Sequence, residues 1–260
     1  MSDAYEGGNR LLDCIPLAER SVFEGALHTA SFAVRDLAIT ADEPLCRVIF
    51  PIDCIFSIVA LLQSGATTEV GTVGREGFVP AEVVSSSPLA LRSTFCQVPG
   101  RAAVMERTVF ERALAAGGTF AVLVRRNASA RLFISEQLTA CNLTHGIVQR
   151  CARWLLMTRD RVGSPDFPLT HEFLAMMLGV RRAGVTEAAG HLQQLGAIRY
   201  RRGHISLIDD ALLTDQACEC YGATNAVLEA SLDCTPPRET VVDASGAAGM
   251  MARMIEHRNA

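Results

Sequence analysis

The stretch LTHEFLAMMLGVRRAGVTEAAGHLQQLGAIRYRRGHISLI, residues 169–208, decides the fold of this chain. Apolar residues at helical spacing predict two short helices joined at Gly179. Thr170 is a good N-cap for the first helix, and Gly179 can adopt the positive φ that a sharp turn requires. The stretch therefore predicts a helix-turn-helix followed by a short hairpin.

The predicted second helix has one apolar and one polar face. Its expected buried stripe consists of Val180, Val185, Ala188, Leu192 and Leu195. The opposite face carries donors and acceptors suited to base edges and phosphates, namely Arg181, Arg182, Thr186, Glu187, His191 and Gln194. This division of the helix favours DNA binding.

Alternating apolar residues around Arg201-Arg202-Gly203 predict a β-hairpin with two arginines at its tip, which suits a wing that contacts the phosphate backbone. The alternative is two ordinary packed helices and a solvated basic loop. The turn glycine, the paired arginines and the hairpin together favour a winged helix-turn-helix. The expected DNA contacts are Thr170, Arg181, Arg182, Gly184, Thr186, Glu187, Arg201, Arg202 and His204.

The charge is segregated along the chain, although the net charge of the 260 residues is only −4. Residues 1–124 carry 9 Arg against 14 Asp and Glu, residues 125–208 carry 12 against 5, and residues 209–260 carry 3 against 9. The basic segment includes the predicted DNA-binding stretch, where attraction to phosphate would act. All basic residues other than histidine are arginine, for which an arginine-favouring base composition of the genome is the simpler explanation.

Composition indicates a globular protein, with 49% hydrophobic residues, no apolar run of membrane-span length and no signal peptide in its polar N-terminus. We therefore expect a cytoplasmic location. The nine cysteines are scattered, and none has the sequence spacing of a zinc or iron–sulfur site; Cys218 and Cys220 are too close to form a tetrahedral site without partners. We expect reduced, mostly buried cysteines, no metal and no cofactor.

The fold class that we predict is α+β. Short β-like runs between Phe32 and Met105 predict a small barrel or sandwich, preceded by an amphipathic helix over 11–25. Helices are expected over 106–116, 119–144 and 146–161. The predicted domains are a barrel over 1–118, a dimerisation helix over 119–145, a winged helix-turn-helix over 146–225 and a flexible C-terminal tail over 226–260.

The long helix has a narrow, partly polar seam at three/four spacing, which suits a contact between two helices of a homodimer. Packing of this seam on the chain's own barrel is the alternative. The expected dimer interface consists of Phe120, Leu123, Asn127, Ala130, Ile134, Gln137 and Cys141.

A barrel, a long helix and a C-terminal winged helix-turn-helix in this order resemble the Crp/Fnr superfamily of bacterial transcription regulators. The resemblance covers roughly residues 11–221 and is strongest at 150–156 and 169–208. It implies a double-stranded β-helix of the cyclic-nucleotide-binding type, a homodimer on double-stranded, pseudo-palindromic DNA, and RNA polymerase as a further partner. It also implies that the protein docks on DNA as family members do but prefers a different half-site sequence, because Ala183 and Glu187 stand where the family pattern has glutamate and arginine.

The resemblance also implies a candidate effector pocket with Glu82, Arg92 and Ser93 as ligand contacts, since cyclic-nucleotide binders carry a glutamate ten residues before an Arg-Ser or Arg-Thr pair. Ala81 replaces the glycine of that pattern, and an alternative alignment places Ala81 and Leu91 at the two positions. We therefore do not expect a cyclic nucleotide, although a small-molecule sensor remains the second hypothesis. Cys14 stands alone near the N-terminus, so we do not expect the iron–sulfur cluster of the oxygen-sensing branch. No catalytic motif is present, which argues against an enzyme.

Overall fold

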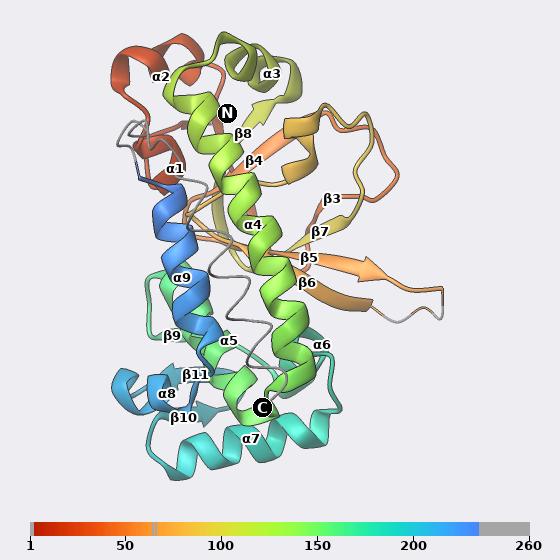
Figure 1. Ribbon diagram of the computed structural model, residues 1–260, viewed down its shortest axis with the longest axis vertical. Coiled ribbons are helices and arrows are strands. Elements are labelled where there is room, and N and C mark those ends of the chain that lie inside the picture. Colours follow the sequence, from red (N-terminus) through yellow and green to blue (C-terminus); the bar gives the residue numbers. More distant parts are fainter. Residues whose placement is uncertain (1–2, 64, 66, 234–260) are drawn as a thin grey trace, which may run out of the picture.

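The computed structural model describes residues 3–63, 65 and 67–233, and it has a β-domain at one end and a helix-rich domain at the other (Figure 1). Two four-stranded antiparallel sheets build the β-domain, which confirms the predicted fold class. One sheet has the order β1 (Asp3–Ala4), β2 (His28–Phe32), β8 (Gly100–Glu106) and β4 (Arg47–Pro51). The other has the order β3 (Leu37–Ile39), β7 (Ser93–Val98), β5 (Ile55–Leu61) and β6 (Thr67–Val73).

The β-domain has its own aromatic core. Phe50, Phe78 and Phe110 are fully buried, with ring centroids 5.7–6.4 Å apart. Such rings are major contributors to core stability through the apolar area that they bury. Phe110 comes from helix α3 (Arg107–Ala116), the helix that the sequence predicted over 106–116, and α3 closes one end of this core.

The predicted single helix over 11–25 is instead two helices, α1 (Arg10–Asp13) and α2 (Leu17–Glu24). Pro16 separates them at the N-cap of α2, because a proline lacks the N–H that a helix interior requires. A 3₁₀ helix, η1 (Ala81–Ser85), lies between β6 and β7.

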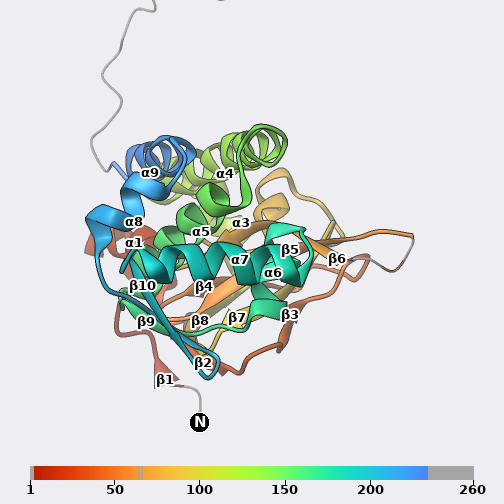
Figure 2. The same ribbon diagram turned by 90° about the horizontal axis from the view of Figure 1, so that it is seen from below.

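The helix-rich domain has a separate core and the predicted order of elements. It comprises α5 (Ile147–Val162), β9 (Asp166–Pro168), α6 (His171–Leu178), α7 (Arg182–Gln194), β10 (Ile198–Arg201), β11 (His204–Leu207) and α8 (Asp210–Gln216). Seen from below, α7 crosses this end of the molecule (Figure 2). In the part of the chain that the structure describes, no helix is both long enough and apolar enough for a membrane span.

The long helix α4 (Gly118–Thr144) has the predicted length but buries the face that we expected at a dimer interface. Phe120, Leu123, Asn127, Ala130, Ile134 and Cys141 are all buried within the single chain. Gln137 Nε2 donates a hydrogen bond to Cys220 Sγ at 3.1 Å. The single chain therefore buries the predicted dimer seam itself, partly on the β-domain, which was the predicted alternative, and partly on α9, which was not predicted.

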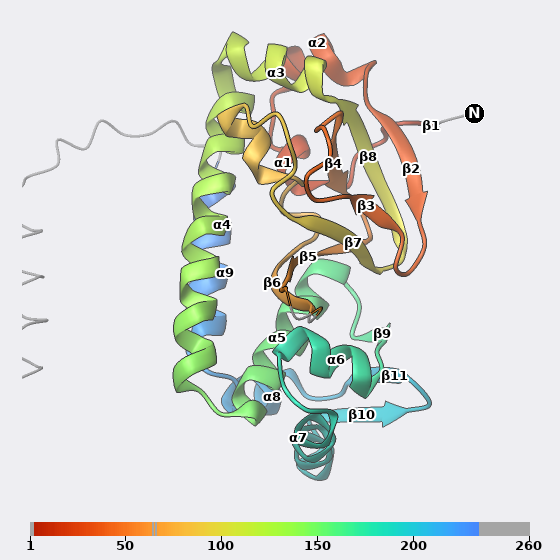
Figure 3. The same ribbon diagram turned by 90° about the vertical axis from the view of Figure 1, so that its right-hand side faces the viewer.

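Helix α9 (Cys220–Ser231) covers part of that face and runs antiparallel to α4 (Figures 1 and 3). Leu228 is buried, and Glu229 forms an ion pair with Arg10 of α1 at 2.6 Å. The predicted flexible tail over 226–260 is thus wrong for residues 226–231, which are helical and packed. Its remainder from residue 234 lies outside the described residues.

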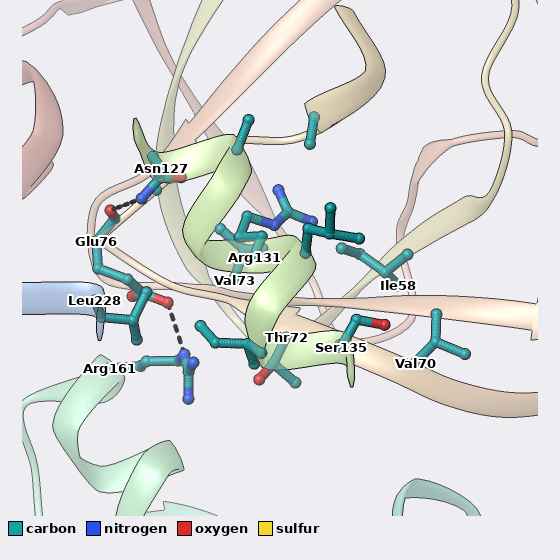
Figure 4. A pocket seen from close by; sticks show the side chains of 16 residues that line it. Ile58, Val70, Thr72, Val73, Glu76, Asn127, Arg131, Ser135, Arg161 and Leu228 are labelled. Carbon is teal, nitrogen blue, oxygen red and sulfur yellow. Dashed lines mark hydrogen bonds and ion pairs between the residues drawn. The ribbon is translucent and has the colours of Figure 1, made fainter. Parts of the chain in front are cut away.

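A buried ion pair joins the β-domain to the helix-rich domain. Arg161 of α5 donates from Nε to Glu76 Oε1 at 2.7 Å, and both side chains are less than a tenth exposed. Gly74 makes this approach possible, because a Cβ at that position would lie 2.7 Å from Arg161 Cβ. Asn127 of α4 donates to the backbone oxygen of Glu76 at 2.9 Å (Figure 4). One loop of the β-domain therefore contacts both α4 and α5.

Substitution of Arg161 by methionine keeps most of the aliphatic side chain but leaves the Glu76 carboxylate buried without its partner. We expect a loss of about 3–5 kcal/mol in the free energy of unfolding, measured by urea denaturation. Adding Glu76→Gln should recover part of this loss. The exposed Arg92→Met is the control and should change stability by less than about 0.5 kcal/mol. A loss at Arg161 as small as that of the control would contradict the structural role of the pair.

Candidate nucleic-acid interface

The helix-turn-helix begins and turns at the residues that the sequence indicated. Thr170 is the N-cap of α6, and its Oγ1 accepts the N–H of Phe173 at 3.1 Å. Gly179 ends α6 with a φ of 62°, in the left-handed region that favours glycine. Helix α7 then starts after Arg181 and packs on α5.

The buried and exposed faces of α7 agree with most of the predicted pattern. Val185, Ala188 and Leu192 are buried, whereas Leu195 is 42% exposed because it lies at the C-cap, beyond the last turn. The exposed set comprises Arg181, Arg182, Thr186, Glu187, His191 and Gln194. Two arginines at the start of an exposed helix give the end of the molecule a positive, hydrogen-bonding surface.

Gly184 does not belong to this surface, contrary to the prediction. A Cβ at Gly184 would lie 3.0 Å from Cδ1 of Ile147 in α5. The absence of a side chain at this partly exposed glycine therefore lets α7 approach α5 closely. Its place in the predicted set of DNA contacts is corrected to a packing position.

His171 and Tyr200 hold α7 in place, and sequence reasoning missed both. His171 Nδ1 and Thr186 Oγ1 are 3.0 Å apart, and the His171 ring stacks on Tyr200 with centroids 4.3 Å apart. Burial, together with the charge of Arg182, lowers the pKa of His171. The side chain of Thr186 therefore contacts α6. This contact could not be predicted from the sequence, because it depends on the distance between Thr186 and His171 in the folded chain.

The wing is a three-stranded sheet in the order β10–β11–β9. Arg202 and Gly203 form its turn with φ values of 49° and 79°, which is the backbone of a type I′ hairpin. Arg201, Arg202 and His204 are placed at its tip, as predicted, with Arg201 and Arg202 exposed. Thr170 lies beside this turn, since its Cγ2 is 4.0 Å from the Cβ position of Gly203. The N-terminus of α6 and the wing tip are thus neighbours.

A partly buried carboxyl lies where the helix-turn-helix domain contacts the β-domain. Glu69 of β6 accepts hydrogen bonds from Trp154 Nε1 at 3.2 Å and from Ser57 Oγ at 2.8 Å. Burial raises the pKa of Glu69 to about 7, although these hydrogen bonds and nearby arginines oppose the shift. The contact between the two domains therefore contains a group that titrates near neutral pH.

The predicted effector contacts do not form a shared pocket. Glu82 Oε1 accepts the N–H of Leu91 at 2.8 Å, and Ser93 Oγ accepts the N–H of Ala41 at 3.0 Å. Arg92 is exposed and donates to the backbone oxygen of Leu91. All three side chains are engaged with local backbone groups.

A cavity of about 250 Å³ lies instead between β6 and α4 (Figure 4). Its polar lining includes Asn127, whose buried Oδ1 has no hydrogen-bond partner, and Arg131, which donates to the backbone oxygen of Phe78 at 2.5 Å. Ile58, Val70 and Val73 supply apolar lining. A small ligand there would contact both the β-domain and the long helix.

Comparison with known proteins identifies the helix-rich domain. A family model of the Crp-like helix-turn-helix domain matches residues 149–215. No curated protein matches the chain. Among solved structures, a CRP-family transcriptional regulator from Thermus thermophilus is similar with a TM-score of 0.59 and 19% identity, over 72% of this chain and 96% of that one.

Two further solved structures are similar over a comparable share of the chain. FixK2 from Bradyrhizobium japonicum gives a TM-score of 0.60 at 15% identity, over 74% of this chain and 98% of that one. The c-di-GMP-responsive global regulator CLP from Xanthomonas campestris also gives a TM-score of 0.60 at 15% identity, over 75% of this chain and 100% of that one. Residues 149–215 therefore match a Crp-like helix-turn-helix domain, and the fold of the chain is similar to that of solved Crp/Fnr-type transcription regulators. The predicted resemblance is thereby confirmed.

Glu69 predicts a pH dependence of stability. With a pKa of about 7 in the folded protein and 4.5 as its ordinary value, the folded chain holds a proton that the unfolded chain has released between these values. Stability therefore falls as pH rises from about 4.5 to above 7. Between pH 5 and 8, we expect the wild-type chain to lose on the order of 1–3 kcal/mol of its free energy of unfolding. Glu69→Gln, which mimics the protonated side chain, should remove this loss.

Denaturant unfolding at both pH values measures this difference. The exposed Glu43→Gln is the matched control and should keep the wild-type pH dependence. Equal pH dependence in wild type and Glu69→Gln would show that Glu69 is not the responsible group.

Proposed function

We propose that the chain acts as a homodimer that binds a specific, pseudo-palindromic DNA site and regulates transcription there. The observation that carries this proposal is the exposed polar face of α7, with Arg181 and Arg182 at its start and the basic wing tip beside it. In winged helix-turn-helix proteins, a helix of this kind enters the major groove. The wing arginines Arg201 and Arg202 suit contacts with phosphates, which position the protein without selecting a sequence.

A different face of α4 from the one predicted supports the homodimer. Val122, Leu132, Phe133 and Leu143 are large apolar side chains that a single chain leaves exposed, Leu132 by 63% and Leu143 by 83%. Val122 and Leu143 are the ends of an exposed series at seven-residue spacing, whose inner members are Ser129 and Glu136. Leu132 and Phe133 lie midway along this series, so apolar side chains recur along the helix as in a partly polar two-helix seam. Because α9 and the β-domain leave this stripe uncovered, a second copy of α4 can pack on it.

Two-fold symmetry then implies the form of the DNA site. A dimer whose recognition helices lie about one helical turn of DNA apart needs two half-sites in inverted orientation. Ala183 and Glu187 on the exposed face of α7 differ from the family pattern, so we propose a half-site of different sequence. Contact with RNA polymerase and a cytoplasmic location stay predictions.

We propose further that no cyclic nucleotide is the effector. Glu82 and Ser93 already accept backbone N–H groups, and Arg92 does not turn toward a shared cavity. The cavity between β6 and α4 favours, as the second candidate function, sensing of another small polar molecule. Thermal-shift measurements with a panel of cyclic nucleotides test the first statement, and stabilisation by any of them would overturn it.

Replacement of Arg182 by alanine tests the recognition helix. We expect DNA affinity to fall by about 1–3 kcal/mol at the preferred site and selectivity to relax at one base pair. A binding assay on a randomised site library measures both quantities. Unchanged affinity and base preference would contradict the assignment of α7 as the recognition helix.

Replacement of Arg202 by alanine should act differently. Because its role is a phosphate contact, affinity should fall alike for all sequences, and the slope of log K against log salt should decrease by about 1. Arg92→Ala, an exposed arginine on the β-domain, is the control of equal charge and should leave both quantities unchanged. A change in base preference at Arg202→Ala would contradict a purely phosphate-binding wing.

Replacement of Leu132 by glutamate tests the dimer face. A charge placed in the apolar seam of both copies should raise the dimer dissociation constant on the order of 100-fold or more. Sedimentation equilibrium measures this constant. Leu17→Glu, at an exposed leucine of α2, should leave the dimer intact. A Leu132→Glu chain that dimerises like wild type would rule out this face.

A further inference from the structure

Four potential metal ligands meet at the lower end of α4 (Figure 1). Within the described part of the chain, Cys141, His145, Cys218 and Cys220 bring their ligand atoms within 4.8 Å of one another. Cys141 Sγ lies 3.5 Å from Cys218 Sγ, and Cys220 Sγ lies 3.7 Å from Nδ1 of His145. The three cysteines are buried and form a cluster of their own, separate from both domain cores.

Two sequence segments supply these ligands in pairs. Cys141 lies in the last turn of α4, and His145 is the C-cap residue that directly follows this helix. Cys218 and Cys220 flank Glu219, the N-cap residue of α9. Sequence reasoning considered the second pair without partners, because 77 residues separate Cys141 from Cys218.

The distances fit a single tetrahedral ion. Zinc bonds to cysteine sulfur at about 2.3 Å and to histidine nitrogen at about 2.0–2.1 Å, which places neighbouring ligand atoms about 3.5–3.8 Å apart. The two separations at 3.5 and 3.7 Å lie in this range. An iron–sulfur cluster needs several metal and sulfide atoms between its ligands, and a set confined within 4.8 Å leaves no room for them.

The surroundings orient and neutralise such a ligand set. Glu219 Oε1 lies 3.1 Å from Nε2 of His145, the outer contact that turns the Nδ1 of a metal-binding histidine toward the ion. Gln137 donates to Cys220 Sγ. Arg150 and Arg153 of α5 are buried and interact electrostatically with Cys141, and the Nε of each has no hydrogen-bond partner. Their positive charge balances the excess negative charge of three thiolates around a divalent ion.

We propose that Cys141, His145, Cys218 and Cys220 bind one soft divalent cation, Zn²⁺ in particular, in a Cys₃His site. The first pair immediately precedes the helix-turn-helix domain and the second pair immediately follows α8. The ion closes the whole domain into one loop and fastens the start of α9 to the end of α4. Its binding free energy adds to folding stability, because the unfolded chain does not present the four ligands together.

Cobalt titration of the full-length chain tests this site. The chain is purified under reducing conditions, stripped with a chelator and titrated with Co²⁺, whose intense visible bands identify tetrahedral thiolate coordination. We expect saturation at one ion per chain, loss of the bands on addition of Zn²⁺, and a higher thermal midpoint for the zinc-loaded chain.

Matched variants assign the ligands. Cys218→Ser and His145→Ala should abolish or shift the cobalt bands, and Glu219→Gln should weaken binding about 10–100-fold while keeping tetrahedral bands. Cys46→Ser, at an exposed cysteine of the β-domain, should bind like wild type.

Three results would overturn the proposal. The first is a wild-type chain that takes up less than one ion per chain. This measurement does not depend on whether a variant folds. The second is a Cys218→Ser spectrum identical to that of wild type. The third is a Cys141–Cys218 disulfide, found by mass spectrometry, in chain purified under reducing conditions. Since metal uptake is measured without DNA, its failure is distinct from a failure of DNA binding.

Discussion

The arrangement of the two domains depends on the buried ion pair between Glu76 and Arg161. A charged pair of this kind is stabilising only when both partners stay in place, since a single buried charge is strongly unfavourable. Gly74 leaves the space that Arg161 occupies, and Asn127 binds the backbone of the same loop. The loop over 74–77 is therefore the point at which the β-domain, α4 and α5 meet.

This meeting point gives a physical route between a ligand and the recognition helix. The cavity beside β6 is lined by Glu76, Asn127 and Arg161, which are the residues that join the domains. A molecule bound there would compete with or reinforce these contacts, and helix α5 packs directly against α7. An effector could thus shift the position of α7 only through its different affinity for two arrangements of this contact.

Local sequence signals predicted the helix-turn-helix well, because its rules are short-range. The cap at Thr170, the positive φ at Gly179 and the turn at Gly203 each depend on residues within a few positions. The face of α4 could not be assigned in this way. Periodicity gives α4 two partly apolar stripes, and only the unexpected packing of α9 shows which one the chain itself covers. Residues 226–231 lacked a strong helical pattern, so their burial against α4 was not predictable.

The same limitation hid the cysteine and histidine cluster. Spacing along the chain identifies a metal site when all ligands lie in one motif, whereas here each pair alone is an incomplete site. The fold brings the two pairs together because α9, which follows the helix-turn-helix domain in the sequence, begins beside the end of α4. Helix α4 contacts the β-domain and α9 on one face, and the two proposals would add a second copy on the other face and an ion at its end. Because all of these contacts involve one continuous helix, a metal that closes the helix-turn-helix domain would also constrain the spacing of the two recognition helices in the proposed dimer.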